Sequence, residues 1–80
     1  MAALAHIPPN ILKRILELDG WKVTYEDGYN WLLEKDGKEP LAIPKRIKLV
    51  PFEIHEHCLA VAEMDLSKYW GLLARAGYVH

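Results

Sequence analysis

The sequence has one cysteine, Cys58, in 80 residues, so no disulfide can form within the chain. A lone cysteine is typical of proteins from reducing compartments, and we therefore expect a cytoplasmic protein. No apolar run approaches the roughly 20 residues that would span a bilayer. The first residues lack the basic start and the long apolar core of a secretory signal. The sequence therefore predicts neither a membrane partner nor a leader peptide.

The sequence also has almost no net charge, with a formal value of −1. Nucleic-acid-binding domains commonly carry a positive excess, so RNA or DNA binding would have to come from a local basic patch. The apolar share of 51% and the charged share of 26% are ordinary for a folded protein. The length predicts one domain over residues 1–80, with flexible ends at 1–7 and 78–80.

A first helix is predicted to begin at Pro8-Pro9 and to stop at Gly20. Proline suits a first helical turn, and glycine suits the left-handed residue that follows a helix. The apolar residues of this segment recur at helical spacing: Ile11, Leu12, Ile15, Leu16 and Leu18.

Three strands are predicted to follow and to form an antiparallel meander. In the first, Trp21, Val23 and Tyr25 alternate with polar residues. The pair Asp27-Gly28 predicts a type I′ turn, after which Trp31 and Leu33 share one face of the second strand with Tyr29. The turn Asp36-Gly37 leads to a short edge strand over Pro40 to Ile43, because proline cannot donate to a ladder.

Two helices complete the predicted fold. Apolar residues at helical spacing favour a helix over Glu53 to Met64, although His55 and His57 alternate as in a strand. Asp65 is a good N-cap for a helix over Leu66 to Arg75 that ends at Gly77. Its predicted buried stripe is Leu66, Tyr69, Trp70 and Leu73. The sequence therefore predicts an α+β fold of two layers: a helix, a three-stranded antiparallel sheet, a helix and an additional C-terminal helix.

The segment Leu16 to Trp31 (LELDGWKVTYEDGYNW) resembles the HicA (YcfA-like) family of small toxins. In that family a short helix runs into a glycine-aromatic pair, a strand, a turn and Gly-Ser-His. Gly28 stands at the family's glycine, Tyr29 at its serine and Asn30 at its catalytic histidine.

The resemblance covers about residues 8 to 73. EKDGKEPLAIP is similar to the family's second turn and third strand, which ends in Val-Pro. The step from Ala62 to Asp65 is similar to the family's helix end, with Glu63 in place of a glycine. The resemblance implies a fold like that of double-stranded-RNA-binding domains.

HicA toxins are metal-independent ribonucleases that cleave messenger RNA and are silenced by an antitoxin. The resemblance therefore implies an RNA ligand, an antitoxin-like protein partner and no cofactor. Histidine suits proton abstraction from a ribose hydroxyl because it titrates near neutral pH, whereas the amide of Asn30 has no accessible protonation change. The family's basic residue before the turn is also replaced, by Tyr25. We expect an RNA-directed protein with impaired or lost nuclease activity.

The candidate RNA-binding cations are Lys45, Arg46 and Lys48, the densest basic run in the chain. Lys13-Arg14 is a second, smaller run. Tyr29 and Trp31 are the candidate stacking residues. The alternatives are a solvated loop whose charge is balanced by nearby glutamates, and aromatic rings that pack in the core.

The run HEHC has two interpretations. On a helix, His55 and His57 point about 200° apart and would not act together. As metal ligands, His55 and Cys58 would share a helix face, and His57 would join them only if the segment were a strand. One cysteine and no CxxC or HxxxH spacing favour core packing of Cys58, and no metal is predicted. The competing function is a non-enzymatic module that binds a protein partner or a second copy of the chain.

Overall fold

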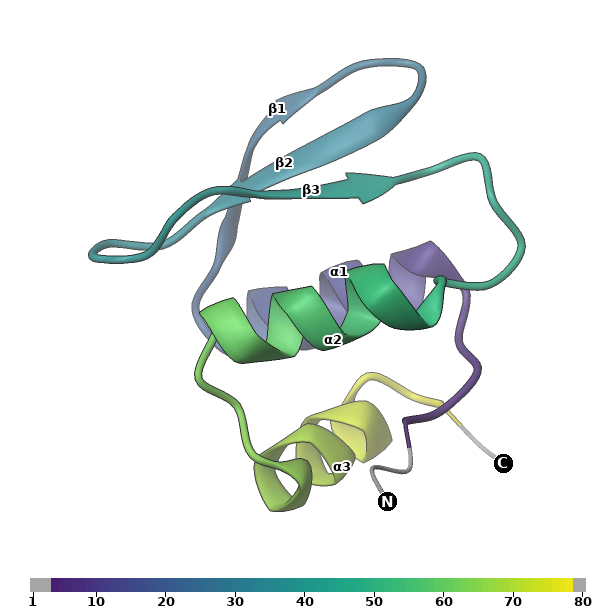
Figure 1. Cartoon of the computed structure of the whole chain (residues 1–80), viewed down its shortest axis with the longest axis vertical. Coiled ribbons are helices and arrows are strands. Elements are labelled where there is room, and N and C mark those ends of the chain that lie inside the picture. The colour runs from purple at the N-terminus through teal and green to yellow at the C-terminus, as the bar shows by residue number, and fades with distance from the viewer. Residues whose placement is uncertain (1–3, 79–80) are drawn as a thin grey trace.

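A computed structural model describes residues 4–78 and shows an α+β fold in the predicted order (Figure 1). The elements are α1 (Pro9–Leu18), β1 (Lys22–Glu26), β2 (Asn30–Glu34), β3 (Leu41–Pro44), α2 (Phe52–Val61) and α3 (Leu66–Arg75). The sheet is antiparallel with strand order β1-β2-β3, so the prediction of a meander is confirmed. In the described residues no helix is long and apolar enough to cross a membrane.

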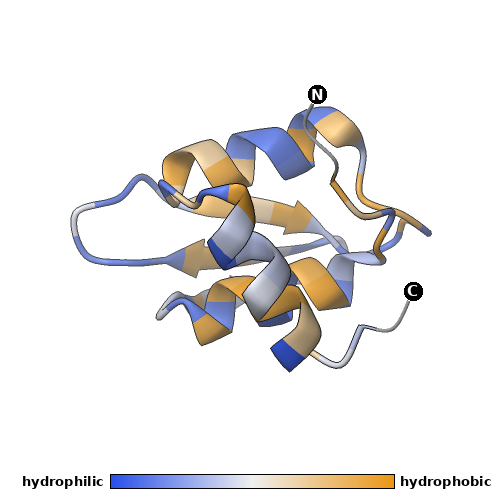
Figure 2. Ribbon diagram, turned by 90° about the horizontal axis from the view of Figure 1, so that it is seen from below, coloured by the Kyte–Doolittle hydropathy of each residue, from blue (hydrophilic) through white to orange (hydrophobic). Residues whose placement is uncertain are grey.

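The helices all lie on one side of the sheet. Figure 1 shows α1 and α2 beneath the strands, with α2 in front of α1, and α3 on the far side of that pair. The structure therefore has three layers rather than the predicted two: the sheet, the pair α1 and α2, and α3, which packs against α1 and not against the sheet. Figure 2, seen from the α3 side, shows the hydrophilic β2–β3 connection projecting beyond the helices. Within residues 4–78, no helix lies over the opposite face of the sheet.

The end of α1 directs the chain into the core. Gly20 adopts a φ of +100°, and its N–H donates to the Glu17 carbonyl at 3.0 Å. The Trp21 N–H donates to the Leu16 carbonyl at 3.0 Å, which completes a Schellman motif. Trp21 enters the core directly afterwards and is 2% exposed. The predicted end of the first helix is confirmed.

A β-bulge changes the faces of β1. Val23 pairs with Leu33, but Tyr25 pairs with Leu32, so Thr24 is the extra residue. Because side chains alternate along a strand, this slip turns Tyr25 away from the face that Trp21 and Val23 share. Tyr25 is 59% exposed, and the prediction that it shares their face is wrong.

The β1–β2 turn is not type I′. That turn needs positive φ at both central residues, and neither Asp27 nor Gly28 has it. Instead the Asp27 carboxylate accepts hydrogen bonds from the N–H groups of Tyr29 and Asn30, both at 2.8 Å. The Asp27 N–H donates to the Asn30 carbonyl at 3.1 Å. The turn is thus fixed by the side chain of Asp27 and not by a positive φ at Gly28.

The C-terminal half follows the predictions closely. β3 starts at Leu41, one residue later than predicted, and is an edge strand as expected. The Asp65 carboxylate caps α3 by accepting from the Lys68 N–H at 2.8 Å. Leu66 is 40% exposed rather than part of the buried stripe, and Leu72 is buried in that helix.

The segment before α1 is packed, so the prediction of a flexible N-terminal end is wrong for residues 4–7. The Ile7 side chain is fully buried, and its carbonyl accepts from the Val50 N–H at 2.9 Å. The Ala5 N–H donates to the Tyr69 hydroxyl at 3.1 Å. Residues 1–3 and 79–80 of those predicted ends lie outside the described residues.

Glu63 follows α2 in the left-handed region, with a φ of 54°. The N–H groups of Glu63 and Met64 donate to the carbonyls of Ala60 and Leu59, as in the motif that ends α1. A side chain with a Cβ is strained in this conformation, and glycine is not. The glutamate carboxylate forms an exposed ion pair with Lys38.

We predict that Glu63→Gly raises the thermal unfolding midpoint by about 4 °C, because it removes the strained φ. Thermal unfolding followed by circular dichroism measures the change. Glu63→Gln is the control, since it removes the charge and keeps the strain, and an exposed ion pair contributes little. A midpoint that falls in the glycine variant would contradict the prediction.

Candidate functional site

The structure gathers four of the five candidate RNA-binding residues at one end of the sheet. The Lys45 N–H donates to the Tyr29 carbonyl at 2.8 Å, so the chain after β3 lies beside the β1–β2 turn. Arg46 then contacts the Tyr29 ring, and Lys45 contacts the Trp31 ring. Lys13 of α1 also contacts the Trp31 ring. We call these residues, Lys13, Tyr29, Trp31, Lys45 and Arg46, the hairpin-end cluster.

Trp31 lies between two ammonium groups. The Lys13 Nζ atom is 5.2 Å from the centre of the indole ring, and the Lys45 Nζ atom is 5.5 Å from it. Both distances are within the range of cation–π attraction. Trp31 is half-buried and packs against the core. Its ring is therefore already occupied by the protein's own cations.

Lys45 is held by its neighbours. Its ammonium group donates to the Glu26 carboxylate at 2.6 Å and to the Asp27 carbonyl at 2.8 Å. The hydrogen bond from Lys45 and then its charge hold the pKa of Glu26 below its usual value. Lys13 likewise pairs with Glu17 at 3.5 Å. Lys45, which is predicted to bind phosphate, also ties the end of β3 to the β1–β2 turn.

Arg46 and Lys48 remain available. Both side chains are exposed, and no carboxylate of residues 4–78 lies within ion-pair distance of either. The nearby Glu53 and Glu56 thus form no ion pair with them. The guanidinium of Arg46 lies 5.2 Å from the centre of the Tyr29 ring, and that ring is 65% exposed. This part of the cluster is an open aromatic ring beside unpaired cations.

Asn30 has a structural role at the family's histidine position. Its backbone N–H donates to the Asp27 carboxylate, and its carbonyl accepts from the Asp27 N–H. It begins β2 opposite Pro44. The amide side chain offers no group that exchanges a proton near neutral pH.

Neither His55 nor His57 belongs to the hairpin-end cluster. His55 is buried beneath Tyr69, with the ring centres 5.3 Å apart, and its Nε2 atom has no hydrogen-bond partner among the described residues. Burial, with a smaller effect of His6, lowers the pKa of His55 to about 4. His57 is exposed and lies 3.7 Å from Glu39 in the β2–β3 connection, which Figure 1 shows at the opposite end of the sheet. As predicted, His55 and His57 point apart.

Cys58 is a core residue, as predicted. Its side chain is buried, and burial raises the pKa of the thiol to about 11. A thiol with so high a pKa is a poor nucleophile and a poor metal ligand at neutral pH. Within residues 4–78 no three His, Cys, Asp or Glu side chains are placed to hold a metal ion.

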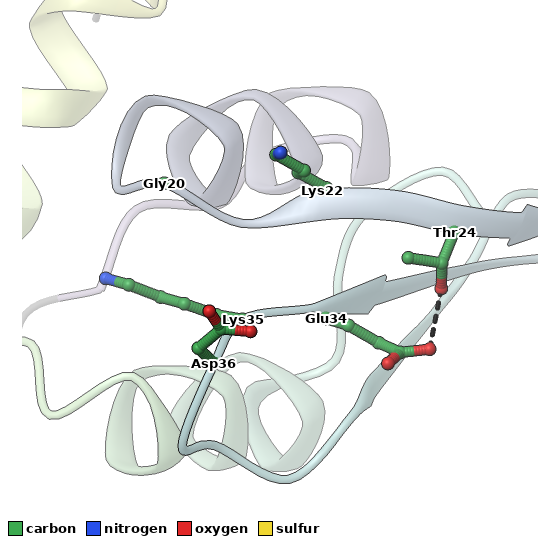
Figure 3. Close-up of a pocket in the computed structure, with 6 residues that line it drawn as sticks. All are labelled: Gly20, Lys22, Thr24, Glu34, Lys35 and Asp36. Atoms are coloured by element: carbon green, nitrogen blue, oxygen red, sulfur yellow. Dashed lines mark hydrogen bonds between the residues drawn. The ribbon is translucent and has the colours of Figure 1, made fainter.

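A separate hollow of about 480 Å³ lies at the other end of β1 and β2 (Figure 3). Its lining is Gly20, Lys22, Thr24, Glu34, Lys35 and Asp36. The Thr24 hydroxyl donates to the Glu34 carboxylate at 2.8 Å, and the Lys35 ammonium donates to the Asp19 carbonyl at 2.7 Å. Thr24 and Glu34 are thus paired with each other and Lys35 with Asp19 outside the lining, and the lining includes no histidine or cysteine. The hollow therefore offers no evident chemistry.

The contact of Lys13 with Trp31 was not predicted from the sequence. The pair Lys13-Arg14 was visible as a small basic run, but nothing in it indicated the contact with Trp31. That contact depends on how α1 crosses the sheet.

Comparison with family models, with curated proteins and with solved structures gives no match.

Proposed function

We propose that this protein binds RNA through the hairpin-end cluster and the adjacent Lys48, and that it does not cleave RNA through Asn30. The observation that carries the proposal is the exposed Tyr29 ring beside Arg46, with Lys48 two residues further along and also unpaired. Cations release counterions when they meet phosphates, and aromatic rings stack on bases. A cytoplasmic protein of this kind would meet RNA directly.

The resemblance to HicA toxins supports the same proposal. Glu63 adopts the left-handed conformation at the place where the family has a glycine. β3 ends at Pro44, where the family has its Val-Pro motif. These positions agree with a divergent relative that keeps the family's backbone. Because Asn30 stands in place of the family's catalytic histidine, such a relative would have lost or impaired nuclease activity.

A second candidate is a non-enzymatic module that binds a protein, either an antitoxin-like partner or another copy of the chain. Leu49 and Phe52 favour it, because they are 50% and 52% exposed at the connection into α2. Exposed apolar side chains in neighbouring positions commonly mark protein contacts. RNA binding is the first candidate because the open ring and the unpaired cations occur together.

We predict weak, salt-sensitive binding of RNA, with the logarithm of the affinity falling by about 1.4 for each tenfold rise in salt if two phosphates are contacted. Filter binding or fluorescence anisotropy across a salt series measures this slope. The double variant Arg46→Gln, Lys48→Gln should abolish most of the slope. Lys22→Gln is the matched control, because Lys22 is exposed at the other end of β1.

The same RNA should remain intact during the incubation. Cleavage by the wild type that disappears in an Asn30→Ala variant would contradict the assignment of Asn30 as non-catalytic. Absence of binding at low salt would reject the proposed function and favour the protein-partner candidate, which concentration-dependent light scattering then tests.

A further inference from the structure

The two aromatic residues of the hairpin-end cluster differ in how accessible their rings are to a ligand. Trp31 is half-buried, and Lys13 and Lys45 both lie against its ring. Tyr29 is 65% exposed and has a single cation, Arg46, against its ring. A planar ligand can therefore reach Tyr29, whereas reaching Trp31 requires displacement of a paired lysine.

The position of Tyr29 is fixed before any ligand arrives. Its N–H donates to the Asp27 carboxylate at 2.8 Å, and its carbonyl accepts from the Lys45 N–H at 2.8 Å. Two hydrogen bonds to neighbouring segments hold the backbone on both sides of the side chain. A ring on a fixed backbone loses little conformational freedom on binding, which favours its use as a contact surface.

We infer that the ligand is single-stranded RNA, held by one unpaired base that stacks on the open side of the Tyr29 ring; this inference rests on the RNA binding proposed above. In the interior of a duplex each base is stacked between its neighbours and cannot present a free face to a side chain. Base–aromatic stacking therefore requires an unpaired nucleotide. Arg46 and Lys48 then meet the phosphates on either side of the stacked base.

Charge alone predicts the opposite preference. A duplex has the higher charge density, so a surface that binds only phosphates holds a duplex at least as tightly as a single strand. Folds like that of double-stranded-RNA-binding domains read duplex shape and backbone. A preference for the single strand would therefore come from stacking and not from the fold or the cations.

The test compares a single RNA strand of about 16 nucleotides with a blunt duplex of about 16 base pairs at low salt. The wild type should bind the single strand about tenfold more tightly. Tyr29→Leu, which keeps apolar bulk and removes the aromatic face, should weaken single-strand binding about tenfold and so abolish the preference for the single strand. Tyr29→Phe should retain the wild-type preference. Tyr25→Leu is the matched control, since Tyr25 is 59% exposed on the uncovered face of the same hairpin.

Equal or tighter binding of the duplex, or full single-strand affinity in Tyr29→Leu, would overturn the inference. In either case salt-sensitive binding that depends on Arg46 and Lys48 would leave the proposed function standing. Absence of binding to both RNAs would overturn both. Circular dichroism of each variant at the same temperature shows that the fold is retained.

Discussion

Acidification from pH 6.5 to pH 4 should lower the free energy of unfolding by about 3 kcal/mol through His55 alone. The ordinary pKa of the imidazole is 6.5, and in the folded protein burial lowers it to about 4, with a smaller effect from His6. Between these values the unfolded chain binds a proton that the folded chain does not. Stability is therefore highest above pH 6.5, falls steadily towards pH 4, and changes no further through this group below that value.

The structure explains why the folded protein resists this proton. His55 is 2% exposed, its Nε2 atom has no hydrogen-bond partner among the described residues, and the Tyr69 ring lies edge-on to it. A proton on Nε2 would place an uncompensated charge in the core, which is far more costly than in water.

Urea unfolding at several pH values between 7 and 4 measures the effect. His55→Phe should flatten the curve and leave stability at pH 7 equal or higher, because it removes an unpartnered polar atom. His55→Leu is a second variant in case the larger ring does not fit the site. His57→Gln is the control, since His57 is exposed on the same helix. Wild type and His55→Phe with the same slope in this range would refute the prediction.

Acidic groups act at lower pH and are separable from His55. Burial raises the pKa of Asp19, but the hydrogen bond from Lys68 and the charges of Lys35 and Lys68 outweigh it and hold that pKa below 3.8. The stabilisation from Asp19 is therefore present above pH 3.8 and is lost only as the pH falls through its lower native value. Glu26 and Glu63, whose pKa values are also lowered in the folded protein, begin to act near their ordinary pKa of 4.5. The part of the curve between pH 6.5 and about pH 5 therefore reports on the imidazole.

The helix ends and the order of elements were predictable because they depend on local chemistry. Gly20, Asp65 and Gly77 each satisfy backbone groups within a few residues of themselves, so the sequence alone contains the signal. The helical spacing of the apolar residues in α1 and α3 also depends only on residues that are close in the sequence. These features fixed the α+β order without knowledge of the packing.

The misses involve contacts between distant parts of the chain. The bulge at Thr24 exists only in the pairing of β1 with β2, and no pattern within β1 indicates it. The packing of Ile7 beside Val50 joins residues that are far apart in the sequence. Lys13 reaches Trp31 because α1 lies against the sheet. Lys45 and Arg46, which follow Pro44, could therefore be predicted as members of the hairpin-end cluster. Lys13 of α1 could not.

Trp21→Ala should be the most damaging single substitution of a tryptophan, with a loss of about 3–5 kcal/mol in the free energy of unfolding. The side chain is 2% exposed, and it belongs to the one core cluster that the sheet and the helices share. A domain of 80 residues has a total stability of about 4–12 kcal/mol, so this variant should approach the limit of folding.

The indole N–H adds a polar contribution to this site. It donates to the Asp19 carboxylate at 3.3 Å, and the same carboxylate lies 2.5 Å from the Lys68 ammonium of α3. Trp21 and Asp19 together connect the end of α1, the start of β1 and the start of α3. Trp21→Phe keeps an apolar ring and removes the N–H, so we expect a smaller loss of about 1–2 kcal/mol.

Urea unfolding followed by far-ultraviolet circular dichroism orders the variants. Trp31→Ala is the comparison that separates burial from residue type, because Trp31 is the same kind of residue but only half-buried. Its loss should be about 1–2 kcal/mol, since less apolar area leaves water when it folds. Equal losses for Trp21→Ala and Trp31→Ala would contradict the assignment of Trp21 as the central core residue. A larger loss for Trp21→Ala, with Trp21→Phe between it and wild type, would show that the residue after Gly20 holds the helices to the sheet.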